Sequence, residues 1–120
     1  MTKTKTTAEL LAEYNVLATY DLIRSVKYGD MANSRRGREI DRLAGELIDA
    51  GVPVGRDGHF PTSSVEDLAA AWQRVARPRI ARVTREEYRH ASRYTRATVE
   101  AWRMTRVRLG LDGNVDEVGL

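Results

Sequence analysis

The sequence predicts a single, mainly α-helical domain with a small β-hairpin. Apolar residues recur at helical spacing in several segments, and each segment has recognisable start and stop signals. The stretch 52–61 instead carries Pro53 and an Asp57-Gly58 dipeptide between two short extended pieces, a pattern typical of a tight hairpin turn. A chain of 120 residues buries roughly 65% of its unfolded surface, which suits one modest domain.

The first predicted helix covers residues 8–28, after a polar and flexible N-terminus at 1–7. Thr6 and Glu9 have the spacing of a capping box, in which a hydroxyl and a carboxylate each bind a backbone N–H group at the helix start. The apolar spacing fits either one long helix or two helices with a bend, ending close to Gly29.

The second predicted helix follows a turn over residues 31–37, with Asn33 or Ser34 as its cap. An apolar stripe runs along it, and Gly51 is expected to stop it by adopting a left-handed conformation. The hairpin at 52–61 comes next. Because its proline cannot donate a ladder hydrogen bond, any sheet here is expected to be a small edge ribbon.

The third predicted helix opens with Ser63 and Glu66, which again have the spacing of a capping box. Pro78 is expected to end or kink this helix, because its ring clashes with the carbonyl one turn earlier.

Thr84 and Glu87 form the last capping-box match and predict a long C-terminal helix over residues 84–109. The acidic, glycine-containing segment 110–120 is expected to be a flexible tail. The folded domain is therefore predicted to span residues 8–109.

The composition excludes several classes of protein. With 42% hydrophobic and 31% charged residues, the chain has the composition of neither a disordered nor a membrane protein, and no membrane partner is expected. The absence of cysteine excludes disulfides, a thiol nucleophile and cysteine-bound zinc. No segment resembles a signal peptide, so a cytoplasmic location is expected.

The charge is distributed unevenly along the chain. Arginine outnumbers lysine 17 to 3, and residues 74–108 carry 11 arginines against three acids, a net charge of +8. Residues 1–73 carry −2 and residues 109–120 carry −3, so the total is only +3. Such asymmetry indicates a polyanion or an acidic protein as partner more than a small-molecule substrate.

Three consecutive segments carry a resemblance to a known family: a basic helix start at 34–43, the run 47–54 that ends in GVPV, and the turn GRDGHF at 55–60. Together they resemble the winged helix-turn-helix of DNA-binding proteins, particularly small bacteriophage-type members. The pattern departs from that family in one respect. Only residues 29–34 separate the first two predicted helices, too few for the short extra helix that winged helices carry there.

The resemblance implies a winged-helix-like domain that binds double-stranded DNA, as a phage or bacterial transcriptional regulator. The first segment would open the recognition helix, whose N-terminal arginines would contact base edges, and the wing tip would contact phosphate or the minor groove. The DNA-binding candidates are Asn33, Ser34, Arg35, Arg36, Arg38, Arg42, Arg56, His59, Arg85, Arg89, Arg93 and Arg96.

Each basic group also has a purely structural interpretation. The arginines of the second helix have acidic residues at ion-pair spacing, as in Arg35–Glu39 and Arg42–Glu46. The C-terminal arginines form one stripe, for which phosphate contact is the favoured interpretation and packing of their stems on the core is the alternative.

The C-terminal helix also carries a series of residues seven apart, which can form a helix–helix seam. The series could pack on the domain's own core or join two copies into a homodimer through the 84–109 helix. The residues are Tyr88, Thr95, Trp102 and Leu109.

No enzyme activity, metal or cofactor is predicted. His59 and His90 have no third ligand nearby in sequence, Glu86 and Glu87 suit a first helical turn, and no nucleophile elbow or glycine-rich phosphate loop is present. The leading hypothesis is a DNA-binding protein. The alternative is a small helical adaptor or inhibitor that binds a host protein through its basic helix, and RNA binding is a third hypothesis.

Overall fold

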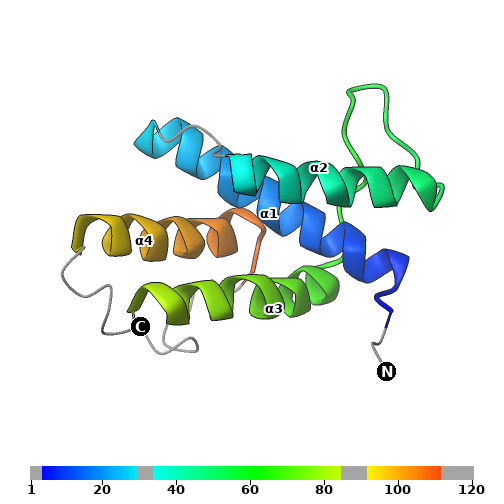
Figure 1. The fold of residues 1–120 in the computed structure, drawn as a ribbon. Coiled ribbons are helices and arrows are strands. Elements are labelled where there is room, and N and C mark those ends of the chain that lie inside the picture. Colours follow the sequence, from blue (N-terminus) through cyan, green and yellow to red (C-terminus); the bar gives the residue numbers. More distant parts are fainter. Residues whose placement is uncertain (1–3, 30–33, 85–91, 112–120) are drawn as a thin grey trace.

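The structure, a computed structural model, shows four α-helices (Figure 1). It describes residues 4–29, 34–84 and 92–111. The helices are α1 (Thr7–Tyr28), α2 (Ser34–Asp49), α3 (Val65–Thr84) and α4 (Ser92–Arg108). Helix α1 packs against each of the other three, and α3 also packs against α4. Among the described residues the fold is entirely α-helical, and none of these helices combines the length and apolarity needed to cross a bilayer.

Helix α1 is one unbroken helix, which decides between the two sequence-based alternatives. The predicted capping box is confirmed: the Thr6 hydroxyl accepts a hydrogen bond from the Glu9 amide (3.1 Å), and the Glu9 carboxylate accepts one from the Thr6 amide (2.9 Å). The buried apolar residues of α1, among them Val16 and Tyr20, form one continuous face along the helix. A bend would not bury more apolar surface. Gly29 ends the helix with φ +63°.

Helix α2 ends as predicted at Gly51, whose φ is +83°. The Gly51 amide donates to the Ile48 carbonyl and the Val52 amide to the Leu47 carbonyl, each at 3.0 Å. These two bonds form a Schellman motif, which satisfies carbonyls left open at a helix end.

The segment 52–61 differs from the predicted β-wing. Its turn is present, with a hydrogen bond from the Gly58 amide to the Gly55 carbonyl (2.9 Å) and one from the Gly55 amide to the His59 carbonyl (2.8 Å). No strand is found here or elsewhere in the described part of the chain. The two arms of this loop have no third strand to support them, and Pro53 lacks a backbone donor. The turn therefore does not extend into a ladder of paired strands.

Helix α3 departs twice from its prediction. Its cap is Ser64, whose hydroxyl accepts from the Asp67 amide (3.2 Å), while the predicted cap Ser63 binds the Asn15 side chain instead. The helix also continues through Pro78 to Thr84. Proline in a helix interior costs about 3 kcal/mol relative to alanine. Continuing the helix buries Ile80 and Val83, each worth about 1.5–3 kcal/mol, which offsets that cost.

The predicted start of the last helix at Thr84 is wrong. Thr84 is the last residue of α3, and its hydroxyl donates to the Ile80 carbonyl (3.0 Å) rather than capping a further helix. Residues 85–91, with Glu87, lie outside the described residues. At the other end, Gly110 (φ +78°) closes α4 with a second Schellman motif, and Leu111 returns to the core.

Two tryptophans occupy the centre of the core, as their apolar helical faces predict. Trp72 and Trp102 are 0% and 1% exposed. The Trp102 ring stacks on Tyr20 at 3.8 Å between centroids, which ties α4 to α1, and the Trp72 indole donates to the Trp102 carbonyl at 3.2 Å. The core thus lies where α1, α3 and α4 meet.

Candidate functional site

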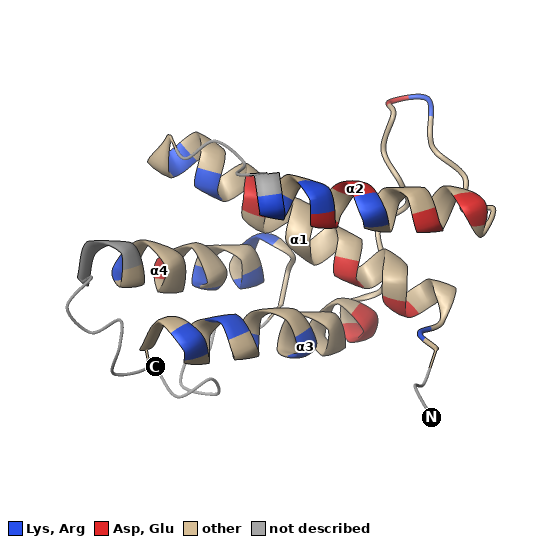
Figure 2. Cartoon of the chain, viewed as in Figure 1, with Lys and Arg blue, Asp and Glu red and all other residues tan. Residues whose placement is uncertain are grey.

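Basic side chains are concentrated in the first part of α2 and in the later part of α3 (Figure 2). The arginines of α2 lie in its first nine positions, together with Glu39 and Asp41, and three of the four arginines of α3 lie in its second half. Glu46 and Asp49 lie near the end of α2, and Glu66 and Asp67 lie in the first turn of α3. An ion pair between Glu39 and Arg79 links the basic part of α2 to the basic part of α3.

The outer face of α2 carries three of the predicted DNA-binding residues. Arg35, Arg38 and Arg42 follow one another at i, i+3 and i+7 and are all exposed. The opposite face buries Leu43 and Leu47 against the rest of the domain. Hydrophobic burial on one side therefore fixes the direction in which these arginines point.

The ion pairs expected on α2 form only in part. Arg42 binds Glu46 at 3.2 Å, in an exposed pair of the kind that contributes little stability. Arg35 does not pair with Glu39, because Glu39 binds a different arginine, Arg79 of α3. Within the described residues, neither Arg35 nor Arg38 has a carboxylate within ion-pair distance.

Arg36 has a different environment from its neighbours. Its Nε donates to the Asp21 carboxylate of α1 at 2.5 Å, and its guanidinium lies 6.0 Å from the centre of the Tyr20 ring. This side chain fastens the start of α2 to α1. Of the remaining candidates at this helix start, Asn33 lies outside the described residues and the side chain of Ser34 is not described.

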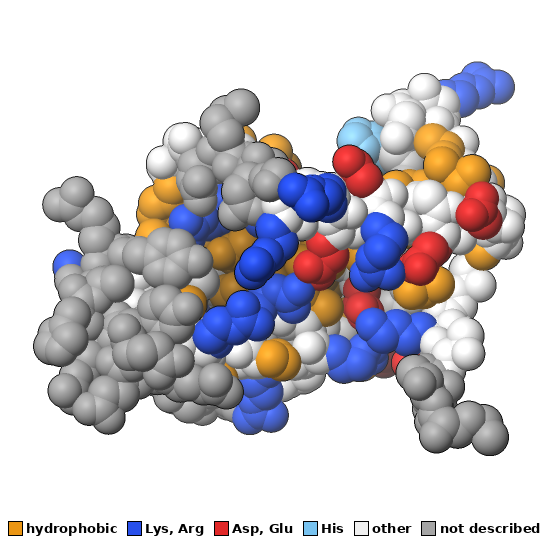
Figure 3. All heavy atoms as spheres, in the orientation of Figure 1, with side chains coloured by type: hydrophobic (Ala, Val, Ile, Leu, Met, Phe, Trp, Pro, Cys, Tyr) orange, Lys and Arg blue, Asp and Glu red, His pale blue; other side chains and the backbone are white. Residues whose placement is uncertain are grey.

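Between α2 and α3 an open cleft of about 390 Å³ is lined by four guanidinium groups and one carboxylate. The basic side chains crowd together over these two helices on one face of the molecule (Figure 3). The buried rings of Tyr20 and Trp102 line the bottom of the cleft. Its charged residues are Arg35, Arg36 and Glu39 from α2 and Arg79 and Arg82 from α3.

The two arginines that α3 contributes differ in how they are held. Arg79 Nη2 donates to both oxygens of Glu39, at 2.7 and 3.0 Å, and its Nη1 donates to the Val75 carbonyl at 2.7 Å. Arg82 is exposed and has no ion-pair partner among the described residues. The cleft therefore combines an anchored guanidinium with one that is available to a ligand.

Sequence reasoning missed Arg79 and Arg82 as site residues. Both lie in the strongly basic segment, but they follow Pro78, where the helix was predicted to end or kink. Once the helix continues, their i, i+3 spacing places them on one face. The positive charge of residues 74–108 indicated that this segment binds an anion. The continuity of α3 through Pro78, which places Arg79 and Arg82 on one face, was not predicted.

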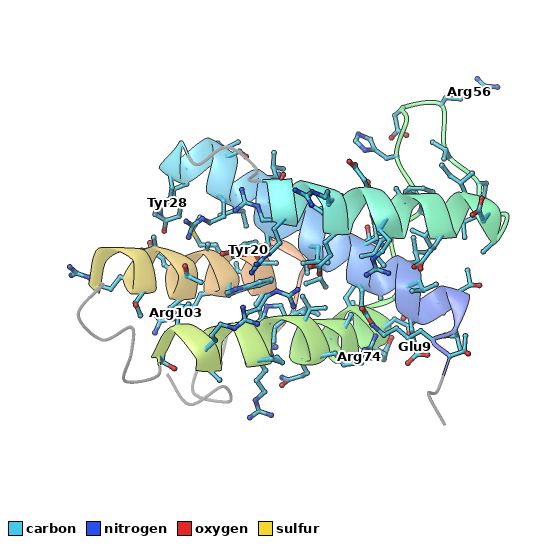
Figure 4. All side chains as sticks on the ribbon, viewed as in Figure 1. Glu9, Tyr20, Tyr28, Arg56, Arg74 and Arg103 are labelled. Atoms are coloured by element: carbon cyan, nitrogen blue, oxygen red, sulfur yellow. The ribbon has the colours of Figure 1, made fainter. Side chains whose placement is uncertain are left out.

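Other predicted residues are not brought to the cleft. Arg56 and His59 are exposed in the loop that follows α2, and Figure 4 shows Arg56 at the tip of this loop, away from Tyr20 in the cleft. In the C-terminal stripe, Arg96 is exposed on α4. Arg85 and Arg89 lie outside the described residues, and the side chain of Arg93 is not described.

The described part of the seven-residue series on the last helix packs within the chain. Trp102 is buried, Leu109 packs on the core and the Thr95 hydroxyl donates to the Val83 carbonyl at 3.2 Å. Tyr88 lies outside the described residues. These described residues therefore pack on the domain's own core, as one of the two alternatives predicted. A homodimer through the 84–109 helix stays a prediction.

The described residues contain no group of three histidine or acidic side chains that could hold a metal ion. His59 lies in the exposed loop, and His90 falls outside the described residues. Comparison with protein-family models, curated proteins and solved structures finds no match to this chain.

Proposed function

We propose that this protein binds double-stranded DNA through the exposed face of α2, as a phage or bacterial transcriptional regulator. The observation that carries the proposal is the row of three exposed guanidiniums, Arg35, Arg38 and Arg42, within the first nine residues of a helix whose other face is buried. Recognition helices present their N-terminal side chains to base edges in this manner.

The dimensions of the row suit a short stretch of major groove. Seven residues of helix separate Arg35 from Arg42, about 10 Å at a rise of about 1.5 Å per residue. This length corresponds to about three base pairs at about 3.4 Å each. Arginine can donate to both acceptors of a guanine, so Arg35 and Arg38, which are without carboxylate partners in the described residues, are the best candidates for base readout.

Phosphate contacts would come from residues that flank this face. Arg82 lies across the cleft from Arg35, and the exposed loop with Arg56 and His59 follows the other end of α2. In this proposal the loop takes the place of a wing without being a β-ribbon. The arginines at 85, 89, 93 and 96 would add further phosphate contacts. Such contacts orient a protein on the duplex without reading its sequence.

Salt dependence of binding to a random duplex tests the proposal. We expect the logarithm of the affinity to fall linearly with the logarithm of the salt concentration, because released counterions accompany each phosphate contact. Fluorescence anisotropy of a labelled duplex measures this. An affinity independent of salt, or no binding at low salt, would contradict the proposal and favour the adaptor hypothesis.

Substitutions separate base readout from general charge. The Arg35→Ala and Arg38→Ala variants should lose sequence preference in selection from a random pool of duplexes, at about 1–3 kcal/mol per lost bidentate contact. The matched control is Arg74→Ala, which removes the same charge from α3 (Figure 4), outside the α2 face. Arg74 pairs with Glu13 of α1. Equal effects of all three substitutions would show that only net charge matters.

A further inference from the structure

We propose that the cleft between α2 and α3 is a binding site for a single phosphate group, held by Arg35, Arg79 and Arg82. The inference goes beyond the proposed DNA contact, because it concerns the recess beside the exposed row and does not require Arg38 or Arg42. Among the residues that the structure describes, four guanidiniums and one carboxylate, that of Glu39, line this recess.

The charge of the cleft favours an anionic ligand. Guanidiniums that line one cleft repel one another, and an anion bound among them offsets that repulsion. Glu39 compensates Arg79, and Asp21 compensates Arg36 from behind, in α1. Arg35 and Arg82 have no such compensation from any described residue. A phosphate group would supply it for both.

The cleft is also partly organised in advance. Arg79 is fixed by Glu39 and by the Val75 carbonyl, and its guanidinium therefore keeps one orientation without a ligand. Arg82 lies three residues further along the same helix, and Arg35 approaches from α2. One fixed and two unpaired guanidiniums give a phosphate several charge-assisted hydrogen bonds at little cost in ordering.

The position of Arg35 adds a second electrostatic contribution. It lies in the first turn of α2, which begins at Ser34, and the N-terminal end of a helix carries partial positive charge. This effect decays within about one turn, so it reaches a ligand bound beside Arg35 but not one bound near the middle of the helix.

The size of the cleft indicates more than a bare ion. Its volume of about 390 Å³ lies at the lower end of the range for small-molecule pockets, about 300–1,000 Å³. Leu17, Tyr20 and Trp102 provide an apolar floor. The chemistry therefore fits a phosphate attached to an organic group. The group would come either from a small phosphomonoester or from the sugar–phosphate backbone of DNA.

Titration with inorganic phosphate, with adenosine 5′-monophosphate and with a short duplex tests the inference on the full-length protein. Ionic strength is kept constant with chloride. Tryptophan fluorescence reports occupancy, because Trp102 lines the cleft, and thermal unfolding gives an independent reading. We expect a saturable change with phosphate or the monophosphate, and roughly tenfold weaker binding in Arg35→Ala and Arg82→Ala.

The control variant is Arg108→Ala, which removes one exposed guanidinium from the last turn of α4, outside the cleft lining, and should bind phosphate like the wild type. Circular dichroism checks that all variants fold. No saturable response to either small ligand, or an equal loss in the control variant, would overturn the inference.

The duplex titration identifies the source of the phosphate. Because Arg35 belongs to both proposed sites, the Arg82→Ala variant separates the two sources. Weaker duplex binding by Arg82→Ala would assign the site to the DNA backbone, whereas unchanged duplex binding with weaker phosphate binding would assign it to a small phosphomonoester. Duplex binding without any phosphate response would refute the cleft site and leave the proposed DNA contact standing. Phosphate binding without duplex binding would support the cleft site and refute the proposed DNA contact.

Discussion

Arg79 and Arg82 lie about one turn apart on α3, yet their surroundings differ. Arg79 is about two-thirds buried and donates to Glu39 and to a backbone carbonyl. Arg82 is exposed and adds positive charge to a cleft that already contains three other guanidiniums. The first side chain therefore contributes to stability, whereas the second contributes only repulsion until an anion binds.

This difference predicts opposite consequences of substitution. Arg79→Ala should lower the free energy of unfolding by about 0.5–1 kcal/mol, because Glu39 loses a partly buried partner. Arg82→Ala should leave it within about 0.5 kcal/mol of the wild type, or raise it slightly. Urea unfolding in phosphate-free buffer measures both. A loss in Arg82→Ala equal to that in Arg79→Ala would show that Arg82 has a structural role instead.

Another ion pair joins Lys27, in the last turn of α1, to Glu100, in the middle of α4, at 3.0 Å. The hydrogen bond from Lys27 and the charge of Lys27 hold the pKa of the Glu100 carboxyl below its usual 4.5. The same pair raises the pKa of Lys27 above 10.5. Both groups therefore stay charged across the neutral range.

The pKa shift of Glu100 predicts how the pair depends on pH. A carboxyl whose pKa is lowered by folding stabilises the folded state above its unfolded pKa, and this contribution is lost as the pH falls through the folded pKa. Glu100→Gln should therefore melt at a slightly lower temperature than the wild type at pH 7. The difference should shrink as the pH falls below the usual carboxyl pKa of 4.5, and it should vanish once the pH passes the lowered pKa of the folded state. A difference that persists in acid would indicate that packing, not charge, is responsible.

At the residue scale, the sequence predicted the candidate site in part. Arg35 and Arg38 could be recognised because local helical spacing alone places them on one outer face. Nothing in the sequence showed that Arg36 pairs with Asp21, 15 residues earlier, because that contact depends on how α2 packs on α1. The same limit applies to Glu39, which has an arginine four residues before it but binds Arg79, 40 residues away.

Gly45 inside α2 and Gly51 just after α2 differ in whether their backbone conformation requires glycine. Gly45 is exposed in the helix interior, and a Cβ added there would meet no atom within 4 Å. Gly51 also has open space but adopts φ +83°, a conformation that side chains with a Cβ rarely adopt. Space is available at both positions, so backbone conformation alone distinguishes them.

The pair gives a test of α2 as an element. Gly45→Ala should stabilise the protein by about 0.5–1 kcal/mol, because alanine loses less backbone entropy in a helix. Gly51→Ala should destabilise it by about 1–2 kcal/mol, the cost of a left-handed residue with a Cβ. Thermal unfolding compares the two variants. Stabilisation by both would mean that the Schellman motif does not end α2 in solution.

Local chemistry predicted two helix ends correctly, at Thr6 and at Gly51, but the capping-box spacing at Ser63 and at Thr84 did not give helix starts. The capping box at Thr6 and the stop at Gly51 involve only neighbouring residues. The continuation of α3 past Pro78 depends on burying Ile80 and Val83 among other helices, which local rules cannot include. The turn at Gly58 follows from its own sequence, but a β-ribbon also needs a partner strand.

At the scale of the whole molecule, α2 packs against fewer neighbouring helices than α1, α3 or α4 does. Helices α1, α3 and α4 share the core around Trp72 and Trp102, whereas α2 packs extensively on α1 alone. Two ion pairs, Arg36–Asp21 and Arg79–Glu39, supplement that contact. The helix that carries the proposed DNA-binding face is thus also the one whose detachment disturbs the fewest core contacts.

This arrangement predicts local unfolding of α2 ahead of the rest. In hydrogen exchange, amides around Leu43 should exchange faster than those around Trp72, because the opening of α2 leaves the shared core intact. An anion bound between Arg35 of α2 and Arg82 of α3 would join the two helices, so phosphate should slow exchange in α2 more than in α3. Equal exchange in α2 and α3 without phosphate would mean that the described helices unfold only as one unit. Equal exchange with phosphate would mean that binding in the cleft does not hold α2 in place.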